Sequence, residues 1–194
     1  MKLSQSMLPG GTIAAVVFAG VYTFAQTPAA RQGEVPTQAG ATRAVAEIKG
    51  SGVSGKAELV ERKQGTGTVV DVTVTLTGLK PGQHGVHLHA IGKCEPDFAA
   101  AGGHFDPGPA SNTDPDANHP YHMGDLPNAE ANASGAATIK AVTTRVTVSP
   151  GPLSIFDADG TAIIIHGNPD QGITGEPKSG VSGGPRVGCG VFTK

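Results

Sequence analysis

Residues 68–76 (TVVDVTVTL) alternate apolar and polar side chains, and this period of two is typical of a half-buried β-strand. Shorter runs of the same kind occupy residues 44–49, 56–61, 85–89, 133–142, 145–148, 161–166 and 187–192. Gly, Pro or β-branched residues interrupt every run that could continue as a long helix, and the chain holds 29 Gly and 15 Pro among its 194 residues. About eight short strands with frequent turns predict a single all-β domain, an antiparallel sandwich or barrel.

The first 25 residues have the composition of an export signal. Lys2 is followed by a mostly apolar run at residues 12–24, and small residues precede Gln26. The run is too short to span a bilayer comfortably, so we expect cleavage after Ala25 and no stable membrane insertion. Residues 26–43 are expected to be a flexible linker before a folded domain at residues 44–194. Export predicts a periplasmic or extracellular protein, and the formal net charge of −2 does not suggest a nucleic-acid partner.

The only two cysteines are Cys94 and Cys189. In an oxidising compartment a single disulfide is the expected state of such a pair. The alternative is a catalytic thiol, but neither cysteine has sequence neighbours that would lower its pKa.

Histidines gather in places where they could bind a metal ion. His87 and His89 lie one residue apart in a predicted strand, so they share a face at a separation of about 7 Å. Two long segments, residues 91–132 and 167–184, have little strand character, and loops of this length usually serve a function or hold a ligand. The remaining candidate donors lie in the first segment or at the edge of the second: His104, His119, His122, Asp125 and His166. Histidine with a nearby carboxylate suits zinc, and imidazoles alone suit copper or zinc, although a lone strand histidine such as His166 is more often a core residue.

Six ordered motifs make the chain resemble the copper–zinc superoxide dismutases, in their exported bacterial form. They are residues 85–89, Cys94, residues 103–107, 122–125, 165–170 and 183–190. The resemblance extends from about residue 44 to the C-terminus and implies a Greek-key β-barrel of eight antiparallel strands.

The resemblance also implies a role for each matching residue, with one copper and one zinc ion per subunit. The implied copper ligands are His87, His89, His104 and His166, and the implied zinc ligands include His104 as a bridge, His122 and Asp125. Cys94 and Cys189 match the disulfide of the family. Arg186 matches an arginine beside the copper, and Asp170 matches a carboxylate that links a copper-bound to a zinc-bound histidine. His84 matches a structural position.

The chain departs from the family at the middle zinc histidine. That histidine normally precedes the match of His122 by about nine residues, and here residues 111–114 (SNTD) hold none. His119 is the spare candidate, if the loop brings it to zinc. Otherwise the site binds zinc weakly, uses Asp114 or Asp116, or stays partly empty. Asp106 stands where the family usually has Asn.

The implied reaction is the dismutation of superoxide to O₂ and H₂O₂, with His104 and Arg186 as the residues that take part in it. Lys178 is expected either to attract the anion over a longer range or to be an ordinary solvated side chain. A copper-buffering module on the same barrel would lack the arginine or the fourth copper histidine. An adhesive sandwich would lack the ordered His and Asp set. The sequence leaves both a monomer and a homodimer open.

Overall fold

The computed structural model describes residues 42–108 and 111–194, which form nine strands and one short 3-10 helix. The strands are β1 (Thr42–Gly50), β2 (Ser54–Gln64), β3 (Gly67–Thr77), β4 (Gly82–His84), β5 (Val86–His89), β6 (Ala129–Ala131), β7 (Ala137–Thr143), β8 (Ala162–His166) and β9 (Arg186–Val191), and the 3-10 helix is η1 (Phe98–Ala101). Only Gly85 separates β4 from β5, so the nine strands correspond to eight runs of extended chain.

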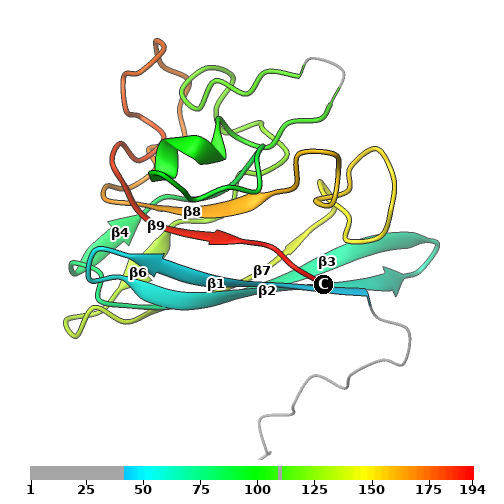
Figure 1. Cartoon of the computed structure of the whole chain (residues 1–194), viewed down its shortest axis with the longest axis horizontal. Helices are drawn as coiled ribbons and strands as arrows, with labels where there is room; N and C mark the ends of the chain where they lie inside the picture. The colour runs from blue at the N-terminus through cyan, green and yellow to red at the C-terminus, as the bar shows by residue number, and fades with distance from the viewer. Residues whose placement is uncertain (1–41, 109–110) are drawn as a thin grey trace, which may run out of the picture. The chain divides into compact units, whose positions relative to one another are not determined.

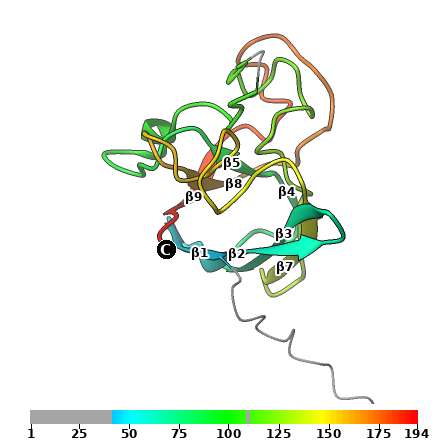
Figure 2. The same ribbon diagram turned by 90° about the vertical axis from the view of Figure 1, so that its right-hand side faces the viewer.

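Seven strands form one antiparallel sheet in the order β5-β8-β9-β1-β2-β3-β7, and β4 pairs with β6 in a small second sheet. Figure 2 shows the large sheet curling so that β5, β8 and β9 face β2, β3 and β7 across the interior. Strand β3 pairs with β7 and not with β4, the next strand in the sequence, so the connection from β3 to β4 crosses from the large sheet to the small one. The prediction of an all-β antiparallel barrel is confirmed.

The alternation of residues 68–76 corresponds to the two faces of β3. Val70, Val72, Val74 and Leu76 are at most 2% exposed and belong to the main core, whereas the intervening residues are more accessible. Burying a Val or Leu side chain stabilises a fold by about 1.5–3 kcal/mol, so this face fixes the register of β3 against its neighbours.

Two predicted strands differ from the structure. Residues 133–142 begin in a turn instead, because Gly135 has φ of 78° and the Asn132 side chain accepts the backbone N–H groups of Ser134 and Ala136. Residues 145–148 form no strand. Thr147 makes only an isolated backbone bridge to Ser154, and the carboxylate of Glu61 accepts the next two N–H groups, those of Val148 and Ser149, so the pairing does not extend into a strand.

Strands β5 and β8 each have two buried faces. Val86 and Leu88 point into the core, and His87 and His89 alternate to the outer face of the sheet. In Figure 1 the segments between β5 and β6 and between β8 and β9 both lie over this outer face. The two long segments singled out in the sequence therefore cover the side of the sheet that carries the histidines.

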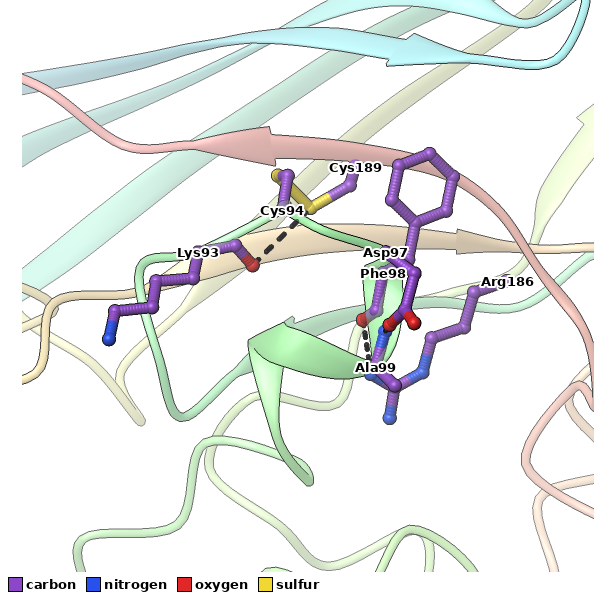
Figure 3. Close-up of a disulfide and its surroundings, with 7 residues drawn as sticks. All are labelled: Lys93, Cys94, Asp97, Phe98, Ala99, Arg186 and Cys189. Atoms are coloured by element: carbon purple, nitrogen blue, oxygen red, sulfur yellow. Dashed lines mark hydrogen bonds between the residues drawn. A yellow bond between two sulfur atoms is a disulfide. The ribbon is translucent and has the colours of Figure 1, made fainter.

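A disulfide joins the first long loop to the sheet. Cys94 and Cys189 are bonded across 95 residues, as predicted, with a Cα–Cα distance of 5.8 Å (Figure 3). Immediately after Cys94, the side chain of Asp97 accepts the N–H of Ala99 and begins η1. This end of the loop is therefore held close to β9.

The predicted signal peptide and linker, residues 1–25 and 26–43, lie outside the described residues except for the last two positions of the linker. These two, Thr42 and Arg43, already belong to β1. Within the described part of the chain, none of the helices is long and apolar enough to cross a membrane.

Candidate metal centre

Four imidazole rings meet on the outer face of the sheet. His87 and His89 come from β5, His166 ends β8, and His104 is brought in by a bridge between its backbone and that of His89. Each of the four is at most 2% exposed, and they offer nitrogen atoms that all lie within 4.8 Å of one another. The structure therefore brings together all four residues predicted to bind copper.

Each of these rings has one nitrogen occupied by an oxygen acceptor. His87 Nε2 donates to Asp170 Oδ2 at 3.0 Å, His89 Nδ1 to Gly102 O at 3.0 Å, His104 Nδ1 to Asp125 Oδ1 at 2.8 Å and His166 Nδ1 to Gly184 O at 3.0 Å. Carbonyl and carboxylate oxygens only accept, so each partner fixes the tautomer and the orientation of its ring.

The other nitrogen of each ring is buried and has no hydrogen-bond partner among the described residues. These atoms are His87 Nδ1, His89 Nε2, His104 Nε2 and His166 Nε2. Burying a nitrogen without a hydrogen-bond partner costs free energy of folding. Four such nitrogens that point to one place are therefore explained by a metal ion that they would bind. The all-imidazole set suits copper, so the residues present fit the metal predicted there.

A second group of donors shares His104 with the first. His104, His119, His122 and Asp125 offer ligand atoms within 4.8 Å of one another. Asp125 contacts all three rings, with Oδ1 2.8 Å from His104 Nδ1 and Oδ2 3.3 Å from His122 Nδ1 and 3.4 Å from His119 Nδ1. Three histidines and one carboxylate are a donor set typical of zinc.

The loop carries His119 into the second group despite its displaced position in the sequence. Two side chains from other parts of the chain hold its segment. Thr174 Oγ1 donates to the carbonyl of His119 at 2.9 Å, and Arg145 Nη1 donates to the carbonyls of Pro120 and His122 at 3.3 and 3.1 Å. Neither Asp114 nor Asp116, the alternative zinc ligands, belongs to any group of candidate donors among the described residues.

Asp170 connects the two groups. Its Oδ1 lies 2.5 Å from His119 Nε2 and its Oδ2 lies 3.0 Å from His87 Nε2. Asn128 holds the backbone of Asp170 on both sides, accepting its N–H at 3.0 Å and donating to its carbonyl at 2.8 Å. The carboxylate that the resemblance implies as a link therefore contacts one histidine from each group.

Burial and charge give the two groups different electrostatic characters. Burial lowers the pKa of His104 to about 4 and that of His166 to about 3, and it lowers the pKa of His89 well below its usual value. Burial also disfavours charge on His119, but Asp125 and Asp170 outweigh it and raise the pKa to about 9. Three rings of the first group, His89, His104 and His166, are thus neutral at neutral pH, as metal-binding imidazoles must be, whereas the two carboxylates favour a proton on His119.

A channel leads from the surface to His166. It has a volume of about 410 Å³ and is lined by Asp114, Pro115, Asp116, His166, Lys178, Gly180, Ser182, Gly184 and Arg186. Arg186 donates to the carbonyls of Phe98 and Gly102, each at 2.6 Å, and extends toward η1 (Figure 3). The guanidinium is therefore fixed at the channel, whereas Lys178 is an exposed residue at the same opening.

Local sequence patterns did not reveal some residues of the site. Arg145 and Asn128 donate to backbone carbonyls of other segments, and Ser182 donates its N–H and hydroxyl to the Asp116 carboxylate. His84, in contrast, lies outside both groups, with its ring nitrogens 2.8 Å from the carbonyl oxygens of Lys80 and His166. Both contacts are to the backbone, in agreement with a structural position.

A curled antiparallel β-barrel with a buried, two-part set of six histidines and one ligating carboxylate defines a metalloprotein with two adjacent metal sites. A family model described as copper/zinc superoxide dismutase matches residues 53–192. The chain therefore belongs to the copper/zinc superoxide dismutase family, whose metals are copper and zinc.

Named relatives agree with this family. The chain is 42% identical over 104 residues to a Cu-Zn superoxide dismutase of Caulobacter vibrioides, a match that covers 50% of this chain and 57% of that protein. It is 35% identical over 120 residues to Cu-Zn superoxide dismutase 1 of Aquifex aeolicus, covering 60% and 68%. An extracellular Cu-Zn superoxide dismutase of Onchocerca volvulus is 35% identical over 134 residues, covering 68% and 63%.

A solved structure has a similar fold. The crystal structure of the clock protein EA4 superposes with a TM-score of 0.65 at 28% sequence identity, covering 78% of this chain and 94% of the other. The overall fold of the chain thus recurs in a known structure.

Proposed function

We propose that this chain is a superoxide dismutase that converts two superoxide anions and two protons into O₂ and H₂O₂. The observation that carries the proposal is the set of four converging, unpaired imidazole nitrogens beside a fixed arginine at the end of a channel. A redox-active metal and a small anion both have a place there. Family membership supports the same reaction.

His87, His89, His104 and His166 would hold copper, and His104, His119, His122 and Asp125 would hold zinc. Copper bound there would supply one-electron redox chemistry by alternating between Cu(II) and Cu(I). His104 is the residue common to both donor groups, so it would help to hold both metals. Asp170 would hold the rings of His87 and His119 in place.

His104 is the residue best placed to deliver a proton. Its Nδ1 faces Asp125, and its Nε2 faces the other three imidazoles without a partner among the described residues. Nε2 is therefore the atom that would carry a proton to the oxygen of the substrate. One proton delivered here and one from solvent complete the formation of H₂O₂.

Arg186 would orient the substrate. Its two carbonyl partners hold the guanidinium in one position, and a fixed cation at the channel favours a small anion over a neutral molecule. Lys178 at the opening of the same channel would add attraction over a longer range, an effect that salt weakens.

We further propose that the protein acts outside the cytoplasm, in the periplasm or the extracellular space, against superoxide generated there. The disulfide supports an oxidising compartment. One relative is named as an extracellular enzyme, in agreement with this assignment.

Purified protein reconstituted with copper and zinc provides the test. It should bind one ion of each kind and accelerate superoxide decay, whereas His166→Ala should fold and lose the activity. The metal-free and zinc-only forms are the controls. Copper binding without faster superoxide decay would point to metal buffering instead, and full activity in His166→Ala would remove that histidine from the copper site.

A further inference from the structure

Asp116 is a buried carboxylate that belongs to neither group of metal donors. It lies in the first long loop and is 4% exposed. All its side-chain partners come from the second long loop. Oδ2 accepts the N–H of Gly180 at 2.9 Å, and Oδ1 accepts the N–H of Ser182 at 3.1 Å and its hydroxyl at 2.9 Å. The carbonyl of Asp116 also accepts the N–H of Gly175 at 2.8 Å.

The segment that Asp116 holds is the one that holds His166. Two residues after Ser182, the carbonyl of Gly184 accepts His166 Nδ1–H at 3.0 Å. Gly183 packs directly on the ring, since a Cβ atom there would lie 2.7 Å from the Cβ of His166. Gly183 also has φ of 118°, which only glycine adopts readily. A shift of residues 182–184 would therefore move the acceptor that sets the orientation and tautomer of His166.

We propose that Asp116 is a positioning residue for His166, acting through Ser182 and the backbone of residues 182–184. The proposal rests on the proposed function, in which His166 binds copper. It gives Asp116 a role different from that of a zinc ligand. Through this contact the loop that carries the zinc donors also determines how one copper donor is presented.

The three hydrogen bonds require a carboxylate. All three partners are donors, and both oxygens of Asp116 accept. An asparagine would point its own N–H₂ group at a donor on one side, at Gly180 or at Ser182. Asp116→Asn therefore changes little in size and yet weakens the contact between the two loops, because the hydrogen bonds on one side are lost.

Asp114 offers a matched control. It lines the same channel, and its carboxylate accepts only from its own loop, the N–H of Asp116 at 3.0 Å and that of Ala117 at 3.3 Å. An asparagine side chain accepts in such a turn as well as an aspartate does. Asp114→Asn thus removes the same charge from the channel and preserves the contact between the loops.

The experiment compares the wild type, Asp116→Asn and Asp114→Asn, each loaded with copper and zinc. The electron paramagnetic resonance spectrum of Cu(II) reports the geometry of the copper ligands, and competition with a chelator gives the copper dissociation constant. In Asp116→Asn we expect a changed Cu(II) spectrum and an unchanged zinc content. The copper dissociation constant should rise by about tenfold, which is the smaller end of the loss in affinity seen when a residue that orients a metal ligand is replaced. Asp114→Asn should match the wild type in all three measurements.

A Cu(II) spectrum and copper affinity equal to wild type in Asp116→Asn would overturn the proposal, and so would equal changes in both variants, because those would reflect charge alone. If Asp116→Asn does not fold, Ser182→Ala takes its place. It removes only the hydroxyl donor and should alter the Cu(II) spectrum in the same direction, and an unaltered spectrum would again overturn the proposal. A wild-type protein that binds no copper would contradict the proposed function itself, so the two failures are distinguishable.

Discussion

The Nε2 atom of His119 lies 2.5 Å from the Oδ1 atom of Asp170, across 51 positions of the sequence. The other nitrogen of the ring, Nδ1, faces Asp125 and has no hydrogen-bond partner among the described residues. This is the arrangement expected of a metal ligand, with one nitrogen oriented by a carboxylate and the other directed to the ion. It supports the proposal that a histidine only three residues before His122 is the fourth zinc donor.

We predict that His119→Ala lowers the zinc affinity by at least about 100-fold and leaves copper bound, because it removes one of four zinc donors and none of the copper donors. Zinc and copper contents after dialysis against a chelator provide the measurement. Tyr121→Phe, a change at an exposed side chain of the same segment, is the control and should retain both metals. Unchanged zinc content in His119→Ala would assign the fourth position to another residue.

Arg145 is predicted to support the zinc group through backbone contacts alone, without contacting a ligand atom. Its guanidinium donates to the carbonyls of Pro120 and His122, so Arg145→Gln should loosen this segment and weaken zinc binding by about tenfold. The visible spectrum of Co(II) placed in the zinc site reports the geometry directly. Arg62→Gln is the matched control, since Arg62 pairs with Asp71 on β2 and β3 and should leave the Co(II) spectrum unchanged. Identical spectra in both variants would contradict the role of Arg145.

The strands and the placement of His87 and His89 on one face could be predicted because their signals are local, whereas the copper roles of His104 and His166 came only from the family resemblance. The alternation of residues 68–76 specifies a strand with one buried face, and the spacing of His87 and His89 places both rings on one side of β5. Alternation also misled the prediction at residues 145–148. There Thr147 forms only an isolated bridge, and the N–H groups of Val148 and Ser149 donate to the Glu61 carboxylate, 87 and 88 positions earlier in the chain.

The contacts that orient the metal donors could not be predicted residue by residue. Asp116 and Ser182 meet only after both long loops have folded onto the outer face of β5 and β8, and no local pattern marks either as a partner of the other. The same holds for Arg145, which contacts the carbonyls of a loop that precedes it by more than twenty positions. Side-chain bonds to the backbone carry little sequence signature, because every residue offers the same carbonyl and N–H groups.

Arg186 is predicted to govern the encounter with superoxide rather than copper binding. Arg186→Glu should retain copper and reduce the rate constant by about tenfold or more at low salt, since it replaces the cation at the channel with an anion. Pulse radiolysis at several ionic strengths measures the rate. Arg186→Lys keeps the charge but loses the two-pronged contact to Phe98 and Gly102, so its rate should be intermediate. A normal rate for Arg186→Glu at low salt would remove the arginine from the mechanism.

The disulfide between Cys94 and Cys189 should contribute strongly to stability, because it closes a loop of 95 residues. On the chain-entropy model, the double variant Cys94→Ser, Cys189→Ser should lose about 4–5 kcal/mol of unfolding free energy. Urea unfolding of the metal-free protein measures the loss. Wild-type protein treated with a reductant should lose a similar amount, and a loss below about 1 kcal/mol in both would show that the loop is already constrained in the unfolded chain.

Glu61 should make the stability of the barrel depend on pH. Burial disfavours its charge, but hydrogen bonds from the Ser149 hydroxyl and the N–H groups of Ser149 and Val148 outweigh burial and lower the pKa below its ordinary value of 4.5. A lowered pKa in the folded state stabilises the protein above pH 4.5, and this contribution is lost as the pH falls through the folded value. The difference in unfolding free energy between wild type and Glu61→Gln should therefore be largest above pH 4.5 and shrink in more acidic urea titrations of the metal-free protein. Glu58→Gln is the control, because Glu58 pairs only with the half-exposed Arg43 and its loss should cost little at any pH. If the difference in unfolding free energy between wild type and Glu61→Gln stays constant as the pH falls, the pKa of this carboxylate is the same in the folded and unfolded states.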